Sequence, residues 1–88
     1  MNDIYKGNIG IKIEIETNLD EGIDYAKLLV TKPNKTTEEW ECEIDGSVIY
    51  YITKDNDLDV AGIYKLQPYI ETATFKGRGD PSEMQVKE

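Results

Sequence analysis

The chain has 88 residues, enough for one small domain, with an apolar fraction of 39% and a charged fraction of 32% that are typical of folded proteins. Its 18 acidic residues outnumber the 10 basic ones, and the net charge of −8 argues against binding to phosphate backbones. Histidine is missing and Cys42 is the only cysteine, which excludes an internal disulfide and a Cys/His zinc site. We expect neither a signal peptide nor a membrane span, because the first residues are polar and no long apolar run follows.

The first half of the chain predicts strands, because apolar and polar residues alternate with a period of two. Ile11, Ile13 and Ile15 form the apolar face of a first half-buried strand. A second strand over residues 25–32 follows, with small and aliphatic side chains on one face. It ends at Lys32-Pro33-Asn34-Lys35, where proline presets the backbone for a turn and predicts a short hairpin connection.

A second hairpin is predicted in the middle of the chain. Trp40, Cys42 and Ile44 fall on one face of a third strand, opposite a row of glutamates. Asp45-Gly46 supplies residues that tolerate the positive φ of a tight turn, so residues 47–53 should return antiparallel.

The last third continues in the same manner after a polar, acidic loop over residues 54–59. A strand is predicted over residues 63–72, and a final strand over residues 75–86 is interrupted by two glycines and a proline. No segment carries the periodicity of a helix. About seven short strands with turn signals between them predict an all-β sandwich or a small barrel, in one domain over residues 1–88.

Three residues favour an immunoglobulin-like antiparallel β-sandwich over other small sandwiches and barrels. Tyr64 begins a late strand directly after a crossing loop, where a tyrosine corner is expected. Leu66, two residues later, takes the position of the second core cysteine of antibody domains. Trp40 lies on the third predicted strand, where a buried core tryptophan is expected.

Several stretches of the chain resemble a family of small phage and prophage proteins. They are Tyr5-Lys6-Gly7-Asn8-Ile9-Gly10, Lys32-Pro33-Asn34-Lys35, Trp40, Asp57-Leu58-Asp59-Val60-Ala61-Gly62-Ile63-Tyr64-Lys65-Leu66-Gln67-Pro68-Tyr69 and Phe75-Lys76-Gly77-Arg78-Gly79. That family is similar to the immunoglobulin-like domains of virion structural proteins, including upper baseplate proteins. The chain departs from its pattern at Lys35, which replaces a hairpin glycine, at Tyr64, which replaces a tryptophan, and at Pro68. Proline lacks an N–H group, so its strand should meet an edge or a bulge there.

The resemblance implies a non-enzymatic structural or decoration module of a bacteriophage particle, in the tail, baseplate or capsid. Its partners would be other phage structural proteins, met through protein–protein contacts, and its place would be the virion, after synthesis in the bacterial host cytoplasm. We expect a monomer when free and many copies in the assembly. Residues 1–10 and 78–88 carry the weakest strand signal, so neighbouring subunits should order them.

The alternative function is a carbohydrate- or host-surface-binding module. Exposed aromatic side chains would carry it, and the candidates are Tyr69 and whichever of Tyr50 and Tyr51 faces outward. Ordinary strand composition is the better explanation of these tyrosines. Arg78-Gly79-Asp80 matches an integrin-binding tripeptide, to which we give little weight in a chain without a secretion signal.

No catalytic residue, cofactor site or metal site is predicted. Asp55, Asp57 and Asp59 alternate like calcium ligands, but Val60 and Leu66 stand where such a loop needs glycine and glutamate, so turn capping is favoured.

The remaining reactive groups have ordinary explanations. Cys42 is expected to be an inert core thiol. Glu39 and Glu41 share the polar face of one strand, where solvation explains them better than acid–base catalysis.

Overall fold

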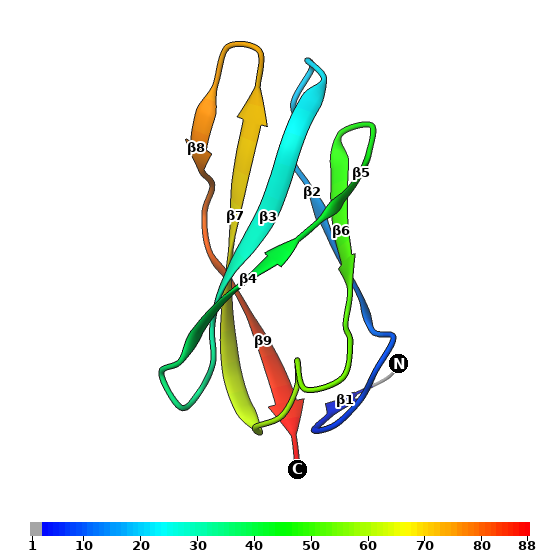
Figure 1. The fold of residues 1–88 in the computed structure, drawn as a ribbon, viewed down its shortest axis with the longest axis vertical. Coiled ribbons are helices and arrows are strands. Elements are labelled where there is room, and N and C mark those ends of the chain that lie inside the picture. The colour runs from blue at the N-terminus through cyan, green and yellow to red at the C-terminus, as the bar shows by residue number, and fades with distance from the viewer. Residues whose placement is uncertain (1–2) are drawn as a thin grey trace.

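The computed structural model describes residues 3–88, and this part of the chain contains nine strands and no helix (Figure 1). The strands are β1 (Ile4–Tyr5), β2 (Lys12–Glu16), β3 (Ile23–Thr31), β4 (Thr37–Glu41), β5 (Glu43–Asp45), β6 (Val48–Ile52), β7 (Gly62–Thr72), β8 (Lys76–Arg78) and β9 (Ser82–Lys87). The larger sheet has the order β1-β9-β7-β3-β4, with β8 also paired to β7, and the smaller sheet has the order β2-β6-β5. The all-β prediction is confirmed.

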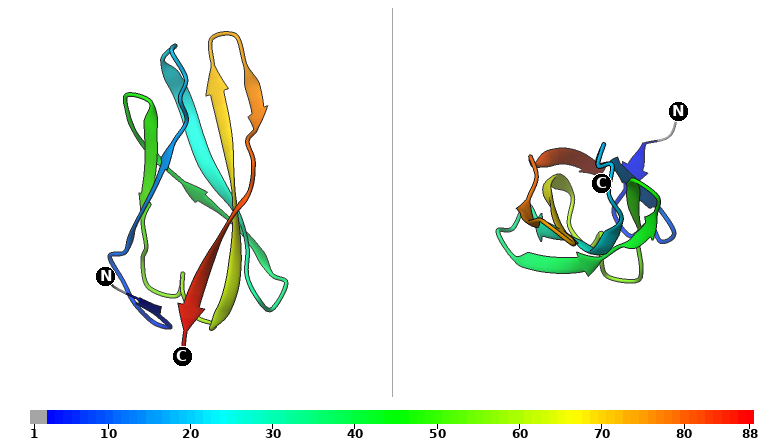
Figure 2. Two further views of the ribbon diagram at one scale, coloured as in Figure 1. Left: turned by 180° about the vertical axis from the view of Figure 1, so that it is seen from behind. Right: turned by 90° about the horizontal axis from the view of Figure 1, so that it is seen from above.

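The core lies between the two sheets, which surround it when the molecule is viewed along its length (Figure 2). The alternation predicted for β3 is confirmed, since Ala26, Leu28 and Val30 are each 1% exposed. Trp40 of the larger sheet stacks on Tyr51 of the smaller one, with ring centroids 4.8 Å apart. Trp40 is 3% exposed, so its predicted burial is confirmed.

The first predicted hairpin is present between β3 and β4. The N–H of Lys35 donates to the carbonyl of Lys32 over 2.9 Å, so Pro33 takes the second position of the turn as expected. Lys35 has a φ of +72°, the left-handed conformation that glycine adopts most readily. A glycine at this position would take the same backbone conformation without strain.

The second predicted hairpin joins β5 to β6, but its turn begins one residue later than expected. Asp45 ends β5 and pairs with Val48, which leaves Gly46 and Ser47 as the two loop residues. Of the predicted pair only Gly46 has a positive φ, at +63°. Glycine at the first loop position is the preference of a type II′ turn, whereas Asp-Gly would have suited type I′.

Trp40, Cys42 and Ile44 lie on the interior side as expected, but the expectation that they belong to one strand is wrong. The chain passes from the larger sheet to the smaller one at Cys42, so β4 pairs with β3 while β5 pairs with β6. Ile44 pairs with the fully buried Ile49 and so keeps the inward face, but it is 37% exposed because β5 is a short edge strand. The predicted third strand becomes two, which partly explains why the described residues contain nine strands and not about seven.

The interruption predicted at Pro68 is confirmed. On one side β7 pairs with β3 through the whole region, and Leu28 lies opposite Pro68. On the other side the pairing with β9 ends at Leu66 and the pairing with β8 begins at Tyr69. The Pro68 carbonyl accepts the N–H of Gly79 over 2.9 Å on this side, so the missing N–H of proline faces the gap between β8 and β9.

The first strand makes the larger sheet mixed, so the expectation of a purely antiparallel sandwich is wrong at one place. Ile4 pairs with Val86 in parallel register. The next strand, β2, belongs to the other sheet, so no hairpin joins β1 to a neighbour and fixes an antiparallel direction.

Both ends of the chain have strand partners within the chain. Residues 82–87 form β9, which runs antiparallel along β7, and Val86 is 1% exposed. Residues 1 and 2 belong to the segment 1–10 that we expected neighbours to order, and they lie outside the described residues. A contribution of neighbouring subunits to the order of both ends stays a prediction.

Candidate functional site

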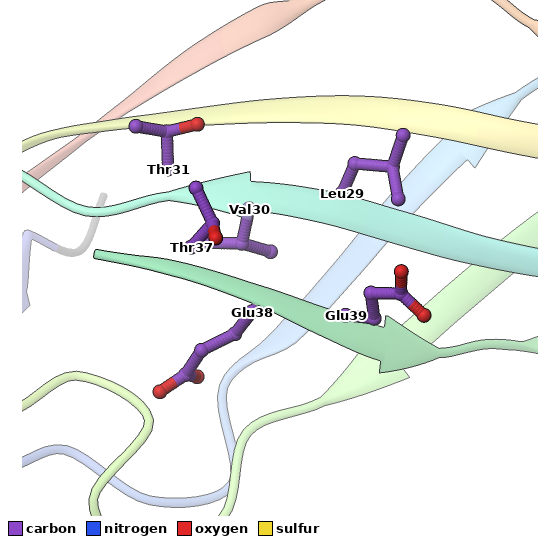
Figure 3. A pocket seen from close by; sticks show the side chains of 6 residues that line it. All are labelled: Leu29, Val30, Thr31, Thr37, Glu38 and Glu39. Carbon is purple, nitrogen blue, oxygen red and sulfur yellow. The ribbon is translucent and has the colours of Figure 1, made fainter. Parts of the chain in front are cut away.

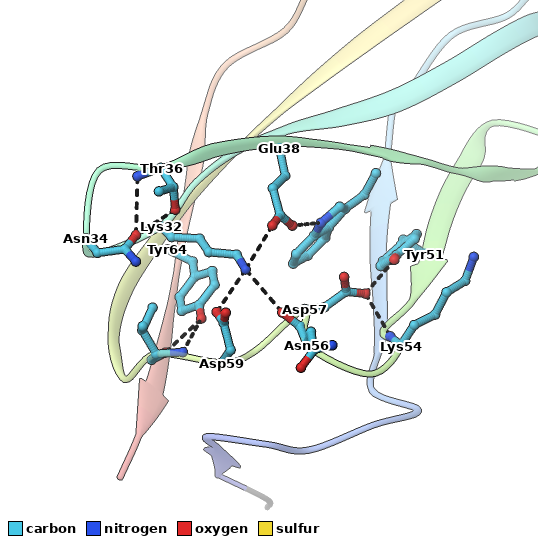
Figure 4. Close-up of polar contacts among 12 residues, drawn as sticks. Lys32, Asn34, Thr36, Glu38, Tyr51, Lys54, Asn56, Asp57, Asp59 and Tyr64 are labelled. Carbon is cyan, nitrogen blue, oxygen red and sulfur yellow. Dashed lines mark hydrogen bonds and ion pairs between the residues drawn. The ribbon is translucent and has the colours of Figure 1, made fainter.

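Lys32, which was expected only to begin a turn, is the most buried charged group of the described residues. The side chain of Lys32 is 2% exposed, at the start of the β3–β4 turn. Its ammonium contacts Asp59 at 2.9 Å, Glu38 at 3.0 Å and the carbonyl of Asn56 at 3.2 Å (Figure 4). Lys32 therefore ties the β3–β4 hairpin to the loop before β7.

The charge state of this cluster is that of an ion pair. Burial alone lowers the pKa of Lys32, but hydrogen bonds to Asp59 and Glu38 outweigh it and raise the pKa above its usual value. The hydrogen bond from Lys32 lowers the pKa of the Asp59 carboxyl. Both groups stay charged at neutral pH, so this lysine is neither a nucleophile nor a general base.

The predicted tyrosine corner forms beside this cluster. Tyr64 is fully buried, and its hydroxyl donates to the carbonyl of Val60 over 2.7 Å and accepts from the N–H of Val60 at 3.2 Å. The bonds run back four residues to the end of the crossing loop, as Figure 4 shows. The predicted role of Tyr64 in fixing this loop is confirmed.

A second tyrosine fixes the other end of the same loop. The hydroxyl of Tyr51 donates to the Asp57 carboxylate over 2.5 Å, and the same oxygen accepts the N–H of Lys54 at 2.7 Å. Burial, and then the neighbouring Asp57, raises the pKa of Tyr51, so its hydroxyl stays protonated. This tyrosine is an anchor for the loop.

The three aspartates that alternate like calcium ligands have separate partners. Asp57 caps the turn at Lys54, and Asp59 pairs with Lys32, while Asp55 is exposed. Residues 3–88 hold no group of three or more acidic, cysteine or histidine side chains arranged to bind a metal. Turn capping describes Asp57 correctly.

The single thiol and the paired glutamates are also engaged. Cys42 is partly buried where the chain changes sheet, and burial followed by the charge of Glu43 raises its pKa to about 11, so the thiol is protonated at neutral pH. Glu39 pairs with Lys27 at 2.8 Å, and Glu41 accepts the Tyr25 hydroxyl at 3.2 Å.

The tyrosines considered for glycan binding do not form one platform. Tyr51 faces inward and is 7% exposed, so Tyr50 is the outward residue of that pair. Tyr50 lies on the smaller sheet under the ammonium of Lys12, 4.6 Å from the ring centroid. Tyr69 lies on the larger sheet, edge-on to Tyr25 with centroids 6.4 Å apart. The two candidates are therefore on different sheets.

A hollow of about 390 Å³ lies along the β3–β4 pair (Figure 3). Its lining residues are Leu29, Val30, Thr31, Thr37, Glu38 and Glu39. Both carboxylates already have basic partners, Lys32 for Glu38 and Lys27 for Glu39. The lining offers hydroxyl groups without a base beside them, so the hollow holds no pair for nucleophilic catalysis.

A second cleft, of about 420 Å³, opens between the sheets where β2 faces β7 and β8. Ile15 and Leu19 form one wall, and Pro68, Ile70 and Phe75 form much of the other. The tripeptide Arg78-Gly79-Asp80 also lines the cleft, with Arg78 at the end of β8 and the other two residues directly after it. Sequence reasoning missed this cleft, although the break at Pro68 marks where the strands separate.

Comparison of the chain with protein-family models, with curated proteins and with solved structures found no match. Within residues 3–88 no helix is long and apolar enough to span a membrane.

Proposed function

We propose that this protein is a non-enzymatic, immunoglobulin-like structural module of a bacteriophage particle, in the tail, baseplate or capsid. Its strand order supports the proposal. β2-β6-β5 corresponds to the B-E-D order of immunoglobulin domains, and β9-β7-β3-β4 corresponds to G-F-C-C′. The corner at Tyr64, on the strand that corresponds to F, supports the same correspondence.

One departure from antibody domains concerns the tryptophan. Trp40 lies on β4, which corresponds to C′, whereas the antibody tryptophan lies on strand C. On β3, the strand that corresponds to C, Leu28 is opposite Trp40 and takes a core position. The ring of Trp40 still reaches the space between the sheets, because it stacks on Tyr51.

The observation that carries the proposal is that two stretches of the resemblance meet in space. Lys32 of the first hairpin pairs with Asp59 of the long motif. Gly62 of the same motif has a φ of +133°, and a Cβ atom there would come within 2.8 Å of Pro33. These motif residues build a shared framework, which is the role expected of a pattern common to structural proteins.

A non-enzymatic role agrees with the groups described above. The Cys42 thiol is protonated, Lys32 is held in an ion pair, and Glu39 is bound to Lys27. None of these has a nucleophile–base geometry. The carbohydrate-binding alternative has less support, since Tyr50 and Tyr69 lie on different sheets.

Mass spectrometry of purified phage particles from the natural host tests the proposal. We expect the protein in the particles at many copies each, removed only under conditions that dissociate the particle. A protein abundant in the lysate and missing from washed, intact particles would contradict the proposal. Glycan-array binding by the free protein would instead favour the carbohydrate-binding alternative.

A further inference from the structure

The two long sides of the sandwich differ in how they are closed. On one side the chain itself passes between the sheets at Cys42, from β4 to β5. On the other side β1 and the segment after it close only one end, where Gly7 bonds to Leu58 and Gly10 bonds to Thr53. Farther along that side the cleft of about 420 Å³ separates β2 from β7 and β8. Figure 2 shows β1 confined to one end.

The walls of this open part are mainly apolar, while Glu16, Arg78 and Asp80 bring charges of both signs to its lining. Ile70 is 6% exposed at the inner wall, while Phe75 is 46% exposed at the mouth. Ile15 and Leu19 are partly buried on the opposite wall. A large exposed aromatic residue beside an apolar cleft is a feature of binding surfaces more than of a finished core.

The same side also presents a free strand edge. The Ile11 carbonyl accepts from Thr53 at 3.0 Å, and the Thr17 N–H donates to Ser47 at 2.9 Å, so both residues face β6. Because bonded residues alternate along an antiparallel pair, Ile13 and Ile15 also face β6. The backbone N–H and C=O groups of Lys12, Glu14 and Glu16 consequently point away from the sheet, toward the open side.

The other edges of the described sheets are less suited to receive a strand. β1 has two residues, and β5 and β8 have three each. Very short edge strands discourage pairing with other chains. β4 has five residues and exposed charges, as β2 does, but the hollow beside its end, lined by Glu41 and Tyr50, is smaller, at about 170 Å³. Among these edges, β2 combines a free ladder of five residues with the larger cleft of about 420 Å³.

The charges around β2 indicate the chemistry of the occupant. Glu14 and Glu16 lie on its solvent face, with Lys12 already paired to Glu14 at 3.3 Å. The whole chain carries a net charge of −8. A strand with the same acidic face would be repelled, whereas a strand with basic outward residues would be attracted. Its inward residues would have to be apolar to enter the cleft.

We propose that the free edge of β2 and the adjoining cleft accept one extended strand of another virion protein, with alternating apolar and basic residues. The inserted strand extends the smaller sheet through the outward backbone groups of β2. Its apolar side chains fill the space beside Ile70 and Phe75, and its basic side chains lie beside Glu14 and Glu16. The virion source of the strand rests on the proposed function, while the site itself does not.

The test uses the folded protein and a capped seven-residue peptide that alternates lysine with valine. We expect the peptide to shift the amide NMR signals of residues 12–16 and the ring signals of Phe75. The same peptide with glutamate in place of lysine should bind at least about tenfold more weakly, because its charges are repelled. Shifts that are missing at millimolar peptide, or equal along β4, would overturn the proposal.

Two variants with matched controls locate the site. Glu14→Pro removes an outward N–H and Phe75→Ser removes the aromatic wall, and each should weaken binding about tenfold. Glu39→Pro on the edge of β4, and Ile63→Ser at a comparably exposed apolar position, should change binding less than about twofold. Phe75 lies outside the strands, so Phe75→Ser leaves every strand pair intact. Unchanged peptide binding in this variant would refute the cleft as the binding site, and this result does not depend on whether the proline variant folds.

Two other outcomes separate this inference from the proposed function. Sedimentation showing that the wild-type protein dimerises alone, and that Phe75→Ser is a monomer, would assign the edge to a second copy and overturn the proposal. Particles that contain the protein while the peptide fails to bind would overturn the strand site and leave the function standing. Peptide binding by a protein missing from particles would overturn the function and the virion source of the strand.

Discussion

Replacing Tyr64 by phenylalanine tests how the crossing loop is fixed, because it deletes one oxygen atom and leaves the core ring in place. That oxygen serves both the carbonyl and the N–H of Val60, at 2.7 and 3.2 Å. Tyr64 is fully buried, so water cannot easily take the place of its hydroxyl. The variant leaves two backbone groups without this partner while it creates almost no cavity.

The expected loss in the free energy of unfolding is about 1–3 kcal/mol, the cost of leaving buried polar groups unpaired. For a chain of this size a urea m-value near 1 kcal/mol/M is expected, so the unfolding midpoint should fall by about 1–3 M. Equilibrium urea unfolding, followed by the fluorescence of Trp40, measures this shift. The m-value should stay unchanged, since the surface exposed on unfolding is the same.

Tyr69→Phe is the matched control. Its hydroxyl donates to the Glu71 carboxylate at 2.7 Å on the outer face of β7, where solvent can replace the lost bond. Its effect on the free energy of unfolding should lie within about 0.5 kcal/mol. Equal losses in the two variants, or a loss below about 0.5 kcal/mol in Tyr64→Phe, would refute the assignment of the corner.

Four further predictions concern stability and protection. Trp40→Ala should destabilise by about 3–5 kcal/mol, comparable to the total stability of a small domain, and a fully solvent-exposed emission maximum in the native protein would contradict the assumed burial. Lys35→Gly should stabilise by up to about 1 kcal/mol in urea unfolding, because it relieves a left-handed conformation at φ +72°. Burial raises the pKa of Cys42 in the folded protein from 9.0 to about 11, so the protonated thiol favours the folded state. Its contribution to the free energy of unfolding, on the order of 2 kcal/mol, is complete below pH 9 and is lost as the pH rises toward 11. Cys42→Ala should flatten the stability profile in that window, and a profile as steep as that of the wild type would exclude the thiol as its source. If neighbouring subunits order residues 78–88, hydrogen exchange of the free protein should be fast at residues 82–87, and protection equal to that of the central strands would mean that pairing with β7 is enough.

The two hairpins and the core strands could be predicted because their signals are local. Pro33 in the first turn and Gly46 in the second are enough to place the reversals, and the alternation around Leu28 sets the buried face. The corner at Tyr64 was also predictable, since a tyrosine that follows a crossing loop and begins a core strand is a sequence pattern with a structural cause.

The passage of the chain between sheets at Cys42 could not be predicted from periodicity. A residue that continues the alternation of Trp40 and Ile44 looks identical in sequence whether the strand is continuous or bends there. The N–H of Cys42 bonds to the carbonyl of Ala26 at 3.0 Å, after which the chain leaves the larger sheet. Which sheet a residue of this segment joins depends on its pairing with β3 or with β6, and both strands lie outside this segment.

The burial of Lys32 was equally hidden, because its partner Asp59 is 27 residues away in sequence. A lysine next to a proline turn is normally expected to be solvated, and no local sequence pattern distinguishes a buried lysine there from a solvated one. The cleft beside Phe75 likewise depends on contacts between residues far apart in sequence, since residues from β2, β7 and the β8 region form it together. Long-range placement produces both features, and the sequence shows only their parts.

The two ends of the sandwich have different tasks under the proposed function. The β3–β4 turn and the loop before β7 lie at one end, fixed by Lys32, Tyr64 and Tyr51, while the β7–β8 turn lies at the other (Figure 1). Near that second end, Phe75 is at the mouth of the open cleft. A strand bound there would add contacts without disturbing the buried polar network. Stability and docking would then depend on different residues, so variants such as Tyr64→Phe and Phe75→Ser should separate the two.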